Sequence, residues 1–275
     1  MFGITHQGKV RLENQDHFLI CTVHPQVVIH GTSLQDADLL PLRGTRLATV
    51  LVVADGVGGA AAGSDAARVA TEAITRYVSS TLRSYHAAGS SSEEEFLTAL
   101  RAAALEAHDS VRAEAASRTK QKMMATTLTV SIVVWPWLYA VQVGDSREYV
   151  YTNGALSQIT RDQTVGQQLV DIGALPPERL EKSPLRNVLS SAIGADEALP
   201  VVTRVDVSDR GTVVLLCSDG LTKHVSDSEI ESALVAMKSS EQVARELLEL
   251  ALDRGGSDNV TIVVARAPLA RATVN

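Results

Sequence analysis

Apolar and polar positions follow two periods along the first part of the chain. Short, strongly apolar runs at 17–23 and 48–54 predict buried strands. Over 63–84 and again over 92–118, apolar residues recur every three or four positions, which is the spacing of a helix with one buried face. The first part of the chain is therefore expected to hold strands followed by two consecutive helices.

The second part of the chain returns to strand patterns and ends with another pair of helices. Helices are expected at 226–237, where Ser226 and Glu229 have the spacing of a capping box, and at 240–253. Short connections between the strands favour antiparallel pairing, and helices in sequential pairs argue against a parallel sheet with alternating helices. The pattern predicts an α+β fold. The expected strands are 125–134, 137–143, 146–152, 155–160, 188–193, 201–207, 212–218 and 259–266.

Neither a repeat nor a linker interrupts these elements, so a single domain over 1–275 is expected. A polar stretch at 24–46 is broken by proline and glycine, which predicts a long, variable surface loop. A second polar stretch at 161–187 contains a short helical pattern near 165–172.

Composition excludes more functions than it selects. With 45% apolar but only 4% aromatic residues, aliphatic side chains must fill the core, and a net charge of −7 does not favour a nucleic-acid partner. The two cysteines, Cys21 and Cys217, lie in apolar stretches and are interpreted as buried thiols in a reducing compartment. Because the chain shows neither a signal peptide nor a membrane-spanning run, we expect a cytoplasmic protein without a membrane partner.

Candidate chemistry lies where the apolar strands stop. Asp55, Asp145, Asp219 and Asp258 each end or precede such a strand, beside glycine, serine or asparagine. Any one of them alone is a common turn residue. Four carboxylates in one place would repel each other unless a cation neutralised them, and oxygen ligands without a Cys/His set favour Mg²⁺ or Mn²⁺. If the strand ends meet in space, a hard-cation site is expected.

Seven short motifs follow one another over almost the whole chain. They are GKVRLENQD at 8–16, ADGVGG at 54–59, ATT at 125–127, GDSR at 144–147, RNVL at 186–189, SDGL at 218–221 and SDNVT at 257–261. In this order they resemble the PPM family of protein phosphatases, the PP2C type, in its bacterial form. The resemblance implies a four-layer αββα sandwich of two antiparallel sheets flanked by helix pairs. It also implies hydrolysis of phosphoserine and phosphothreonine in proteins.

The resemblance also implies a metal centre of two Mn²⁺ or Mg²⁺ ions that share a water nucleophile. Asp55 would bridge both ions, and the carbonyl of Gly56 would bind one of them. Asp219 and Asp258 would bind the other ion, while Asp16 would act through metal-bound waters.

Arg11 matches the phosphate-binding arginine of the family, and its fork of donors suits two phosphoryl oxygens. The alternative is an ion pair with Glu13 or another carboxylate. Asp145, with Asp219, resembles the pair that holds a third and weaker metal, although Asp145 is equally suited to a hairpin turn.

Three further features follow from the resemblance. Thr126 and Thr127 are equally placed to influence the third site. Residues 161–187 resemble the flap that borders the active site and governs access to it. Val57 stands where some eukaryotic members carry a histidine proposed as general acid, and Gln15 stands where glutamate is common, but neither change removes a direct metal ligand.

Because none of the direct metal ligands implied by the resemblance is replaced, we expect an active phosphatase. The alternative is a catalytically weak, phosphoprotein-binding regulator. Another two-metal hydrolase, such as a phosphodiesterase, would usually carry histidines at the site and would not predict the Arg11 motif. Phosphorylated proteins are the expected partners. By analogy within the family, so are a Ser/Thr kinase and its substrates, and a monomer is expected.

Overall fold

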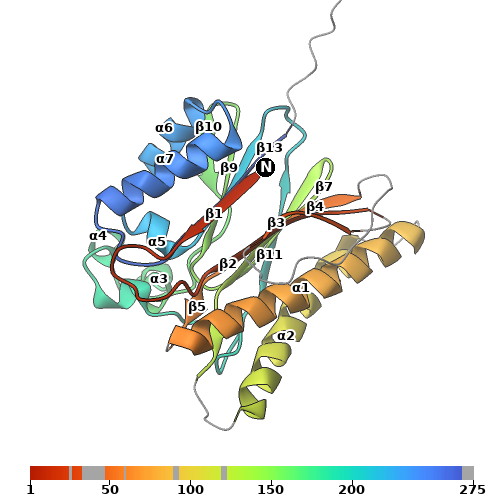
Figure 1. The fold of residues 1–275 in the computed structure, drawn as a ribbon, viewed down its shortest axis with the longest axis horizontal. Coiled ribbons are helices and arrows are strands. Elements are labelled where there is room, and N and C mark those ends of the chain that lie inside the picture. The colour runs from red at the N-terminus through yellow and green to blue at the C-terminus, as the bar shows by residue number, and fades with distance from the viewer. Residues whose placement is uncertain (25–26, 33–46, 59, 89–92, 119–122, 268–275) are drawn as a thin grey trace, which may run out of the picture.

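Two antiparallel sheets face each other at the centre of the molecule (Figure 1). The computed structural model describes residues 1–24, 27–32, 47–58, 60–88, 93–118 and 123–267. In the six-stranded sheet the order is β11 (Val201–Asp206), β8 (Trp137–Val143), β7 (Leu128–Val134), β4 (Ala48–Ala54), β2 (His17–Val23) and β3 (Val27–Thr32). In the five-stranded sheet it is β1 (Phe2–His6), β13 (Val260–Arg266), β12 (Val213–Cys217), β9 (Arg147–Thr152) and β10 (Ala155–Gln158).

Helix pairs cover the outer faces of both sheets. The long helices α1 (Ala60–Ala88) and α2 (Glu93–Ser117) lie on the six-stranded sheet, whereas α6 (Asp227–Val235) and α7 (Ser240–Asp253) lie on the five-stranded sheet. The layers therefore run helix, sheet, sheet, helix. The predicted α+β fold and the four-layer αββα sandwich are confirmed.

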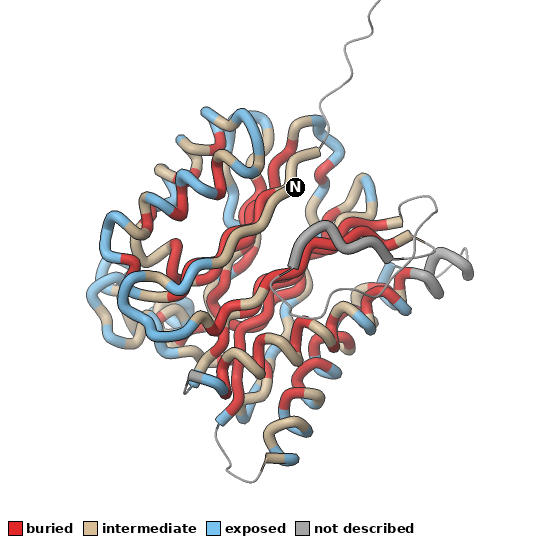
Figure 2. The backbone as a smooth tube through the Cα atoms, in the orientation of Figure 1, coloured by how far each residue is buried: buried red, intermediate tan, exposed pale blue. Residues whose placement is uncertain are grey.

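Three clusters of apolar side chains lie between these four layers. Figure 2 shows the buried residues along the central strands. Under α1, the small side chains Ala66, Ala67 and Ala70 are fully buried, so this helix can lie close to the sheet. Between the sheets, aliphatic residues such as Leu51, Leu138 and Leu216 interlock. The aliphatic core expected from the composition is confirmed, because few aromatic side chains are buried in the described residues.

The predicted loop at 24–46 is wrong in its middle. Residues Val27–Thr32 form β3, which pairs with β2 at the edge of the six-stranded sheet. The register shifts between Ile20 and Cys21, so a bulge lies beside Gly31, and glycine at an edge-strand bulge does not break the pairing. Residues 25–26 and 33–46 of the predicted loop lie outside the described residues.

The predicted strand at 188–193 is also wrong. That segment makes only two isolated bridges, Leu189 with Thr164 and Ile193 with Thr126, because its two ends pair with different parts of the chain. Strand β1 was not predicted, since its half-buried residues at a sheet edge show no clear alternation. The capping box of Ser226 and Glu229 is confirmed at the start of α6.

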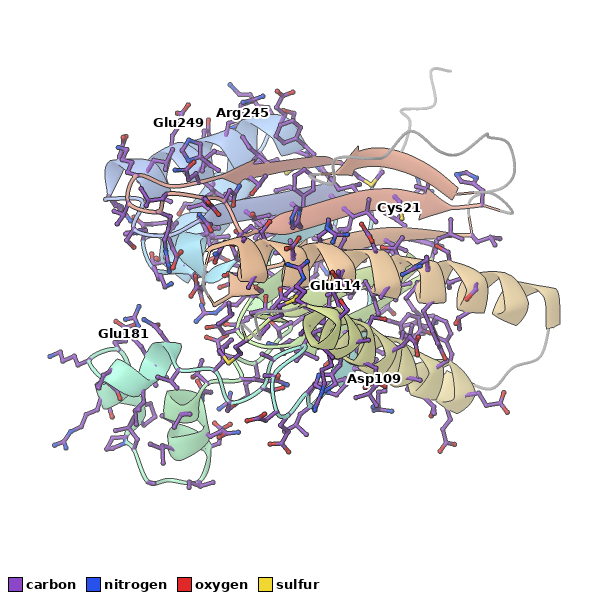
Figure 3. All side chains as sticks on the ribbon, turned by 60° about the horizontal axis from the view of Figure 1, so that its bottom comes forward. Cys21, Asp109, Glu114, Glu181, Arg245 and Glu249 are labelled. Carbon is purple, nitrogen blue, oxygen red and sulfur yellow. The ribbon has the colours of Figure 1, made fainter. Side chains whose placement is uncertain are left out.

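Residues 161–187 contain short helical elements at one side of the sandwich. They are α3 (Val165–Asp171), α4 (Pro177–Leu180) and the 3₁₀ turn η1 (Pro184–Asn187). Thr164 caps α3 by accepting a hydrogen bond from the backbone of Gln167. In Figure 3 these helices, marked by Glu181, project away from the body of the molecule, far from Arg245 and Glu249 on α7.

Both cysteines are buried and free, as expected: Cys21 lies on β2 and Cys217 on β12. Within the part of the chain that the structure describes, no helix is long and apolar enough to cross a membrane.

One carboxyl group lies inside the layer between the sheets. Glu148 on β9 is fully buried, opposite Leu216 of β12, and by hydrogen-bond geometry neither of its oxygens has a partner among the described residues. Burial raises the pKa of Glu148 to about 8, and the nearby Ser131 hydroxyl lowers it only in part. At neutral pH, folding therefore has to protonate this group or bury its charge.

We expect Glu148→Gln to weaken the pH dependence of stability. Because the pKa of Glu148 is higher in the folded than in the unfolded chain, the wild type loses stability as the pH rises from about 4.5 towards 8. On raising the pH from 5 to 8, the wild type should lose on the order of 2–3 kcal/mol more than the variant. Urea unfolding at both pH values measures this. The exposed Glu249→Gln on α7 is the control, and equal losses in Glu148→Gln and wild type would contradict the assignment.

Candidate functional site

Antiparallel pairing brings the strand-end aspartates of both sheets to one rim. In the six-stranded sheet, the first residue of β2, His17, pairs with the last residue of β4, Ala54, so Asp16 and Asp55 are neighbours. In the five-stranded sheet, Cys217 at the end of β12 pairs with Ile262 near the start of β13, which places Asp219 beside Asp258. Asp145 follows β8 and precedes β9, the connection between the two sheets.

Asp16 joins the two sheets at this rim. Its Oδ2 accepts hydrogen bonds from the Ser218 and Thr261 hydroxyls, each at 2.7 Å, and both donors belong to the five-stranded sheet side. The Thr261 hydroxyl is in turn 2.7 Å from that of Thr5, which accepts from the amide of Asn14. Asp16 Oδ1 is buried and has no hydrogen-bond partner in the described residues, so one oxygen is left for a further ligand.

Both threonines of the 126–127 pair hold the backbone of Asp55. The hydroxyl of Thr126 donates to the carbonyl of Asp55 at 2.9 Å, and the amide of Asp55 donates to the hydroxyl of Thr127 at 3.0 Å. Thr127 is also 2.8 Å from the hydroxyl of Ser146, beside Asp145. These contacts fix Asp55 where β4 ends and β5 (Gly56–Val57) begins to pair with β6 (Ala125–Thr126).

Two cations meet the Asp258 carboxylate. Arg11 contacts both of its oxygens, with Nε 2.7 Å from Oδ1 and Nη2 2.8 Å from Oδ2. Lys223 Nζ lies 2.7 Å from the same Oδ2 and 2.6 Å from Asp219 Oδ2. Arg11 therefore forms an ion pair, although with Asp258 and not with Glu13. Its side chain remains half exposed at the rim.

Asn259 fixes the loop that carries Arg11. Its side-chain amide donates to the carbonyls of Gln7 and Glu13, each at 2.9 Å, and its Oδ1 accepts from the amide of Gln15 at 2.9 Å. One side chain next to Asp258 thus ties down both ends of the loop between β1 and β2. This fixation positions Arg11 over the acidic rim.

The carboxyl groups at the rim raise one another's pKa values. Burial, and then the charges of Asp16 and Asp219, raise the pKa of Asp55 well above its usual value. Burial followed by the charge of Asp219 raises the pKa of Asp145 to about 8, and burial raises that of Asp16 to about 6. The pKa of Asp258 alone is lowered, because the hydrogen bonds from Arg11 and Lys223 outweigh the effect of its burial.

These residues fit divalent cations. The donors are hard carboxylate oxygens, and the buried Asp16 Oδ1 and Asp219 Oδ1 have no partners in the described residues. Burial, followed by the charges of neighbouring carboxylates, raises the pKa values of Asp55 and Asp145, and both effects would be relieved by a bound cation. As the side chains stand, no three His, Cys, Asp or Glu residues in the described ranges form a ready metal cage. Lys223 and Arg11 occupy the oxygens of Asp258 instead.

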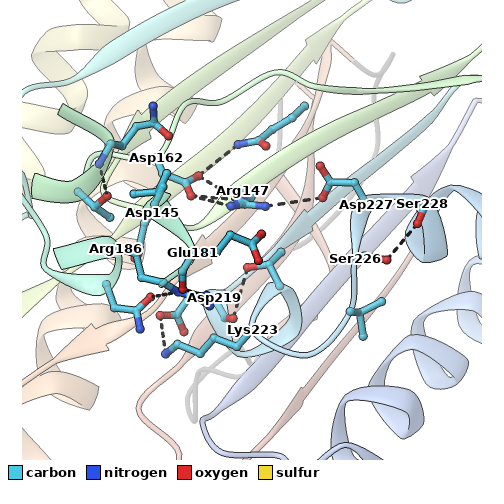
Figure 4. A pocket seen from close by; sticks show the side chains of 17 residues that line it. Asp145, Arg147, Asp162, Glu181, Arg186, Asp219, Lys223, Ser226, Asp227 and Ser228 are labelled. Carbon is cyan, nitrogen blue, oxygen red and sulfur yellow. Dashed lines mark hydrogen bonds and ion pairs between the residues drawn. The ribbon is translucent and has the colours of Figure 1, made fainter. Parts of the chain in front are cut away.

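A cleft of about 490 Å³ opens beside Asp219 and Asp145 (Figure 4). Its opposite wall is formed by residues of the 161–187 segment, among them Glu181 and Arg186. Arg147 also lines the cleft and binds Asp162 through Nε and Nη2, at 2.9 and 2.7 Å from the two carboxylate oxygens. The cleft therefore lies between the acidic rim and the projecting helices.

The site includes residues that sequence reasoning missed. Lys223 is four positions after Asp219, a spacing that pairs charges on a helix and would have pointed to it. Ser218 and Thr261 were part of quoted motifs but had no assigned role, and no local pattern announces that their hydroxyls meet Asp16 from another sheet.

Comparison with known proteins identifies the family. The family model for protein phosphatase 2C matches residues 26–254, so the chain belongs to the protein phosphatase 2C family. The serine/threonine protein phosphatase PstP of Mycobacterium tuberculosis is 37% identical over 218 residues, which are 79% of this chain but only 40% of that relative. The serine/threonine phosphatase stp of Listeria monocytogenes is 29% identical over 265 residues, which cover 96% of this chain and 94% of stp.

Solved structures share the fold along the whole chain. The crystal structure of Mycobacterium tuberculosis PstP is similar with a TM-score of 0.75 and 30% identity, covering 98% of both chains. A structure of the PstP catalytic domain in complex with two manganese ions has a TM-score of 0.72 and 29% identity, covering 98% of this chain and 97% of that one.

We expect Gly56→Ala to disrupt the rim. A Cβ at Gly56 would lie 2.4 Å from the carbonyl oxygen of Gly63 and 2.8 Å from that of Gln15, and backbone cannot yield as a side chain can. The free energy of unfolding in urea should fall by about 3 kcal/mol or more. The control is Gly173→Ala, where the space is open and only the positive φ of +72° costs about 1–2 kcal/mol. A smaller loss in Gly56→Ala than in Gly173→Ala would contradict this packing.

Proposed function

We propose that the protein hydrolyses phosphoserine and phosphothreonine in proteins with the help of two divalent metal ions. The observation that carries the proposal is the convergence of Asp16, Asp55, Asp219 and Asp258 at one rim, with the guanidinium of Arg11 beside them. Membership of the protein phosphatase 2C family supports the same reaction.

The metal ligands proposed are the side chains of Asp55, Asp219 and Asp258 and the carbonyl of Gly56. Mn²⁺ is the first candidate because the PstP catalytic domain was solved with two manganese ions, and Mg²⁺ suits the same oxygen donors. Two such ions would supply an activated water and neutralise charge on the phosphoryl oxygens. Asp16 is proposed to orient metal-bound waters through its free Oδ1, because the Ser218 and Thr261 hydroxyls already hold its Oδ2.

Arg11 is proposed to bind the phosphoryl group of the substrate. Its side chain is half exposed at the rim, and the fork that now contacts both oxygens of Asp258 also matches two phosphoryl oxygens. To bind phosphate, Arg11 would therefore have to release the Asp258 carboxylate and contact two phosphoryl oxygens in its place. Because Asn259 holds both ends of the loop that carries Arg11, this exchange would be confined to the Arg11 side chain.

The third, weaker metal site is proposed at Asp145 with Asp219, with Thr127 beside it through Ser146. Support comes from the place of both carboxyls in one cleft and from the pKa of Asp145, which burial and then the charge of Asp219 raise. The segment 161–187, which forms the other wall of that cleft, is proposed as a flap that limits substrate access. We propose a single phosphatase domain over 1–275.

The alternatives receive less support. A catalytically weak, phosphoprotein-binding regulator would be marked by a lost site aspartate, and each expected aspartate lies at or beside the rim. Another two-metal hydrolase of the phosphodiesterase type does not explain Arg11 at the acidic rim.

Phosphorylated proteins are the proposed substrates, and a Ser/Thr kinase with its substrates is the proposed partner set. We further propose a monomer in the cytoplasm. The two free, buried cysteines are compatible with a reducing compartment.

The decisive experiment is hydrolysis of para-nitrophenyl phosphate by the EDTA-treated protein with and without Mn²⁺. The proposal predicts turnover that depends on Mn²⁺, because the bound ions would supply the activated water and neutralise charge on the phosphoryl oxygens. A phosphothreonine peptide tested in parallel should also be dephosphorylated. No Mn²⁺-dependent turnover of either substrate would refute the proposed function.

Asp219→Ala should lower Mn²⁺-dependent turnover by about 100-fold or more, because it removes a proposed direct ligand. Circular dichroism should show an unchanged fold. The exposed Asp253→Ala on α7 is the matched control and should keep full activity. Full activity in Asp219→Ala would show that the ligand assignment is wrong.

Arg11→Lys should raise KM for a phosphopeptide about tenfold and change kcat less, because lysine keeps the charge but loses the planar fork. Arg245→Lys is the control, since Arg245 also contacts a carboxylate through Nε and Nη2, here the single oxygen Oε1 of Glu241, but lies on α7. Steady-state kinetics in saturating Mn²⁺ measure both variants. An unchanged KM in Arg11→Lys would exclude bidentate phosphate binding.

A further inference from the structure

A lysine lies between two of the proposed metal ligands. Lys223 Nζ is 2.6 Å from Asp219 Oδ2 and 2.7 Å from Asp258 Oδ2, and only 20% of its side chain is exposed. It follows directly after α5 (Asp219–Thr222), so its contact with Asp219 spans one helical turn, whereas its contact with Asp258 joins residues that are 35 positions apart. Figure 4 shows the ammonium group beside the Asp219 carboxylate, at the edge of the cleft.

This contact differs from an ordinary surface ion pair. An exposed pair at this helical spacing contributes about 0.3–0.5 kcal/mol and can form or break freely. Lys223 is mostly buried and touches two carboxylates from different strand ends. Asp219 has no other cation within ion-pair distance in the described part of the chain, so Lys223 alone supplies its direct counter-charge.

The rim requires such a charge when nothing else is bound. Five carboxyl groups lie at or next to it, and in the described residues only Arg11 and Lys223 form ion pairs with any of them. Arg11 contacts Asp258 alone. Without Lys223, the one positive charge of Arg11 would remain at Asp258, and Asp219 would have no cation within ion-pair distance among the described residues.

We propose that Lys223 is an internal counter-ion that holds Asp219 and Asp258 together in the metal-free protein and must release both carboxylates when a divalent cation binds. This inference rests on the metal dependence proposed above. Lys223 would then stabilise the empty site and weaken the apparent affinity for metal, because part of the protein is always in the lysine-bound state.

Lysine has the properties that this role requires. Its charge sits on a flexible stem of four carbons, so the ammonium can leave without moving the backbone, whereas a planar arginine fork would hold a carboxylate more rigidly. The cleft of about 490 Å³ next to Lys223 gives the ammonium room to move, and Glu181 and Asp227 line the same space as alternative partners.

The test compares Lys223→Met with wild type after EDTA treatment. Methionine keeps an unbranched side chain of similar length but carries no charge. In EDTA, the variant should unfold at a lower temperature than wild type, because Asp219 and Asp258 lose their shared cation. In calorimetric titration with Mn²⁺ alone, the variant should bind about tenfold more tightly, since no lysine has to be displaced. A merely structural role would not raise metal affinity.

The exposed Lys238→Met, between α6 and α7, is the matched control and should match wild type in both measurements. Equal or weaker Mn²⁺ binding by Lys223→Met would overturn the proposal, as would an unchanged unfolding temperature in EDTA. If wild type itself bound no Mn²⁺, the proposed function would be refuted. The unfolding temperatures of Lys223→Met and wild type in EDTA would still show whether Lys223 acts as a counter-ion. Should Lys223→Met not fold, Lys223→Gln, which keeps a hydrogen-bond donor without the charge, is measured in its place against the same two outcomes.

Discussion

Repulsion among carboxylates at one rim is the constraint on which the rest of the structure depends. The antiparallel registers of both sheets place acidic residues where β2 and β13 begin and where β4 and β12 end. Burial raises the pKa values of Asp16, Asp55 and Asp145, because it removes water from their charged forms, and the charges of neighbouring aspartates raise them further. A fold that keeps these groups together must counter the repulsion with hydrogen bonds, ion pairs and rigid backbone.

The interactions that offset this repulsion join residues from opposite sides of the sandwich. Asp16 precedes β2 of one sheet and accepts hydrogen bonds from Ser218, which follows β12, and from Thr261 on β13 of the other sheet. Hydrogen bonds to a charged acceptor are stronger than neutral ones. The Asp16 carboxylate, which adds to the repulsion at the rim, therefore also links the two sheets there. Close backbone packing around Gly56 also restricts the rim, because a Cβ at this position would clash with the backbone carbonyls of Gly63 and Gln15.

Local patterns were sufficient to predict an α+β fold and aspartates at strand ends, whereas the four-layer sandwich and the shared acidic site were implied only by the family resemblance. Contacts between distant segments were not predicted. Aspartates at strand ends could be read from the sequence because strand termination is a local signal. Lys223 lies near Asp219 in sequence, yet its second contact, with Asp258, depends on how β12 and β13 pair. For the same reason β3 was missed, since only its partner strand accommodates the bulge beside Gly31. Long-range pairing, not local propensity, decided each of these cases.

The Asp258 carboxylate shows how tightly these contacts are linked. Its Oδ1 accepts from Arg11 Nε and from the amide of Asn259, and its Oδ2 accepts from Arg11 Nη2 and from Lys223. Each partner therefore shares an oxygen with another, so any cation added at Asp258 weakens the hold on both basic side chains at once. Release of Arg11 would make its fork available to a phosphoryl group, and release of Lys223 would free Asp219. The Asp258 carboxylate would thus connect charge binding at the rim to the phosphate binding proposed for Arg11.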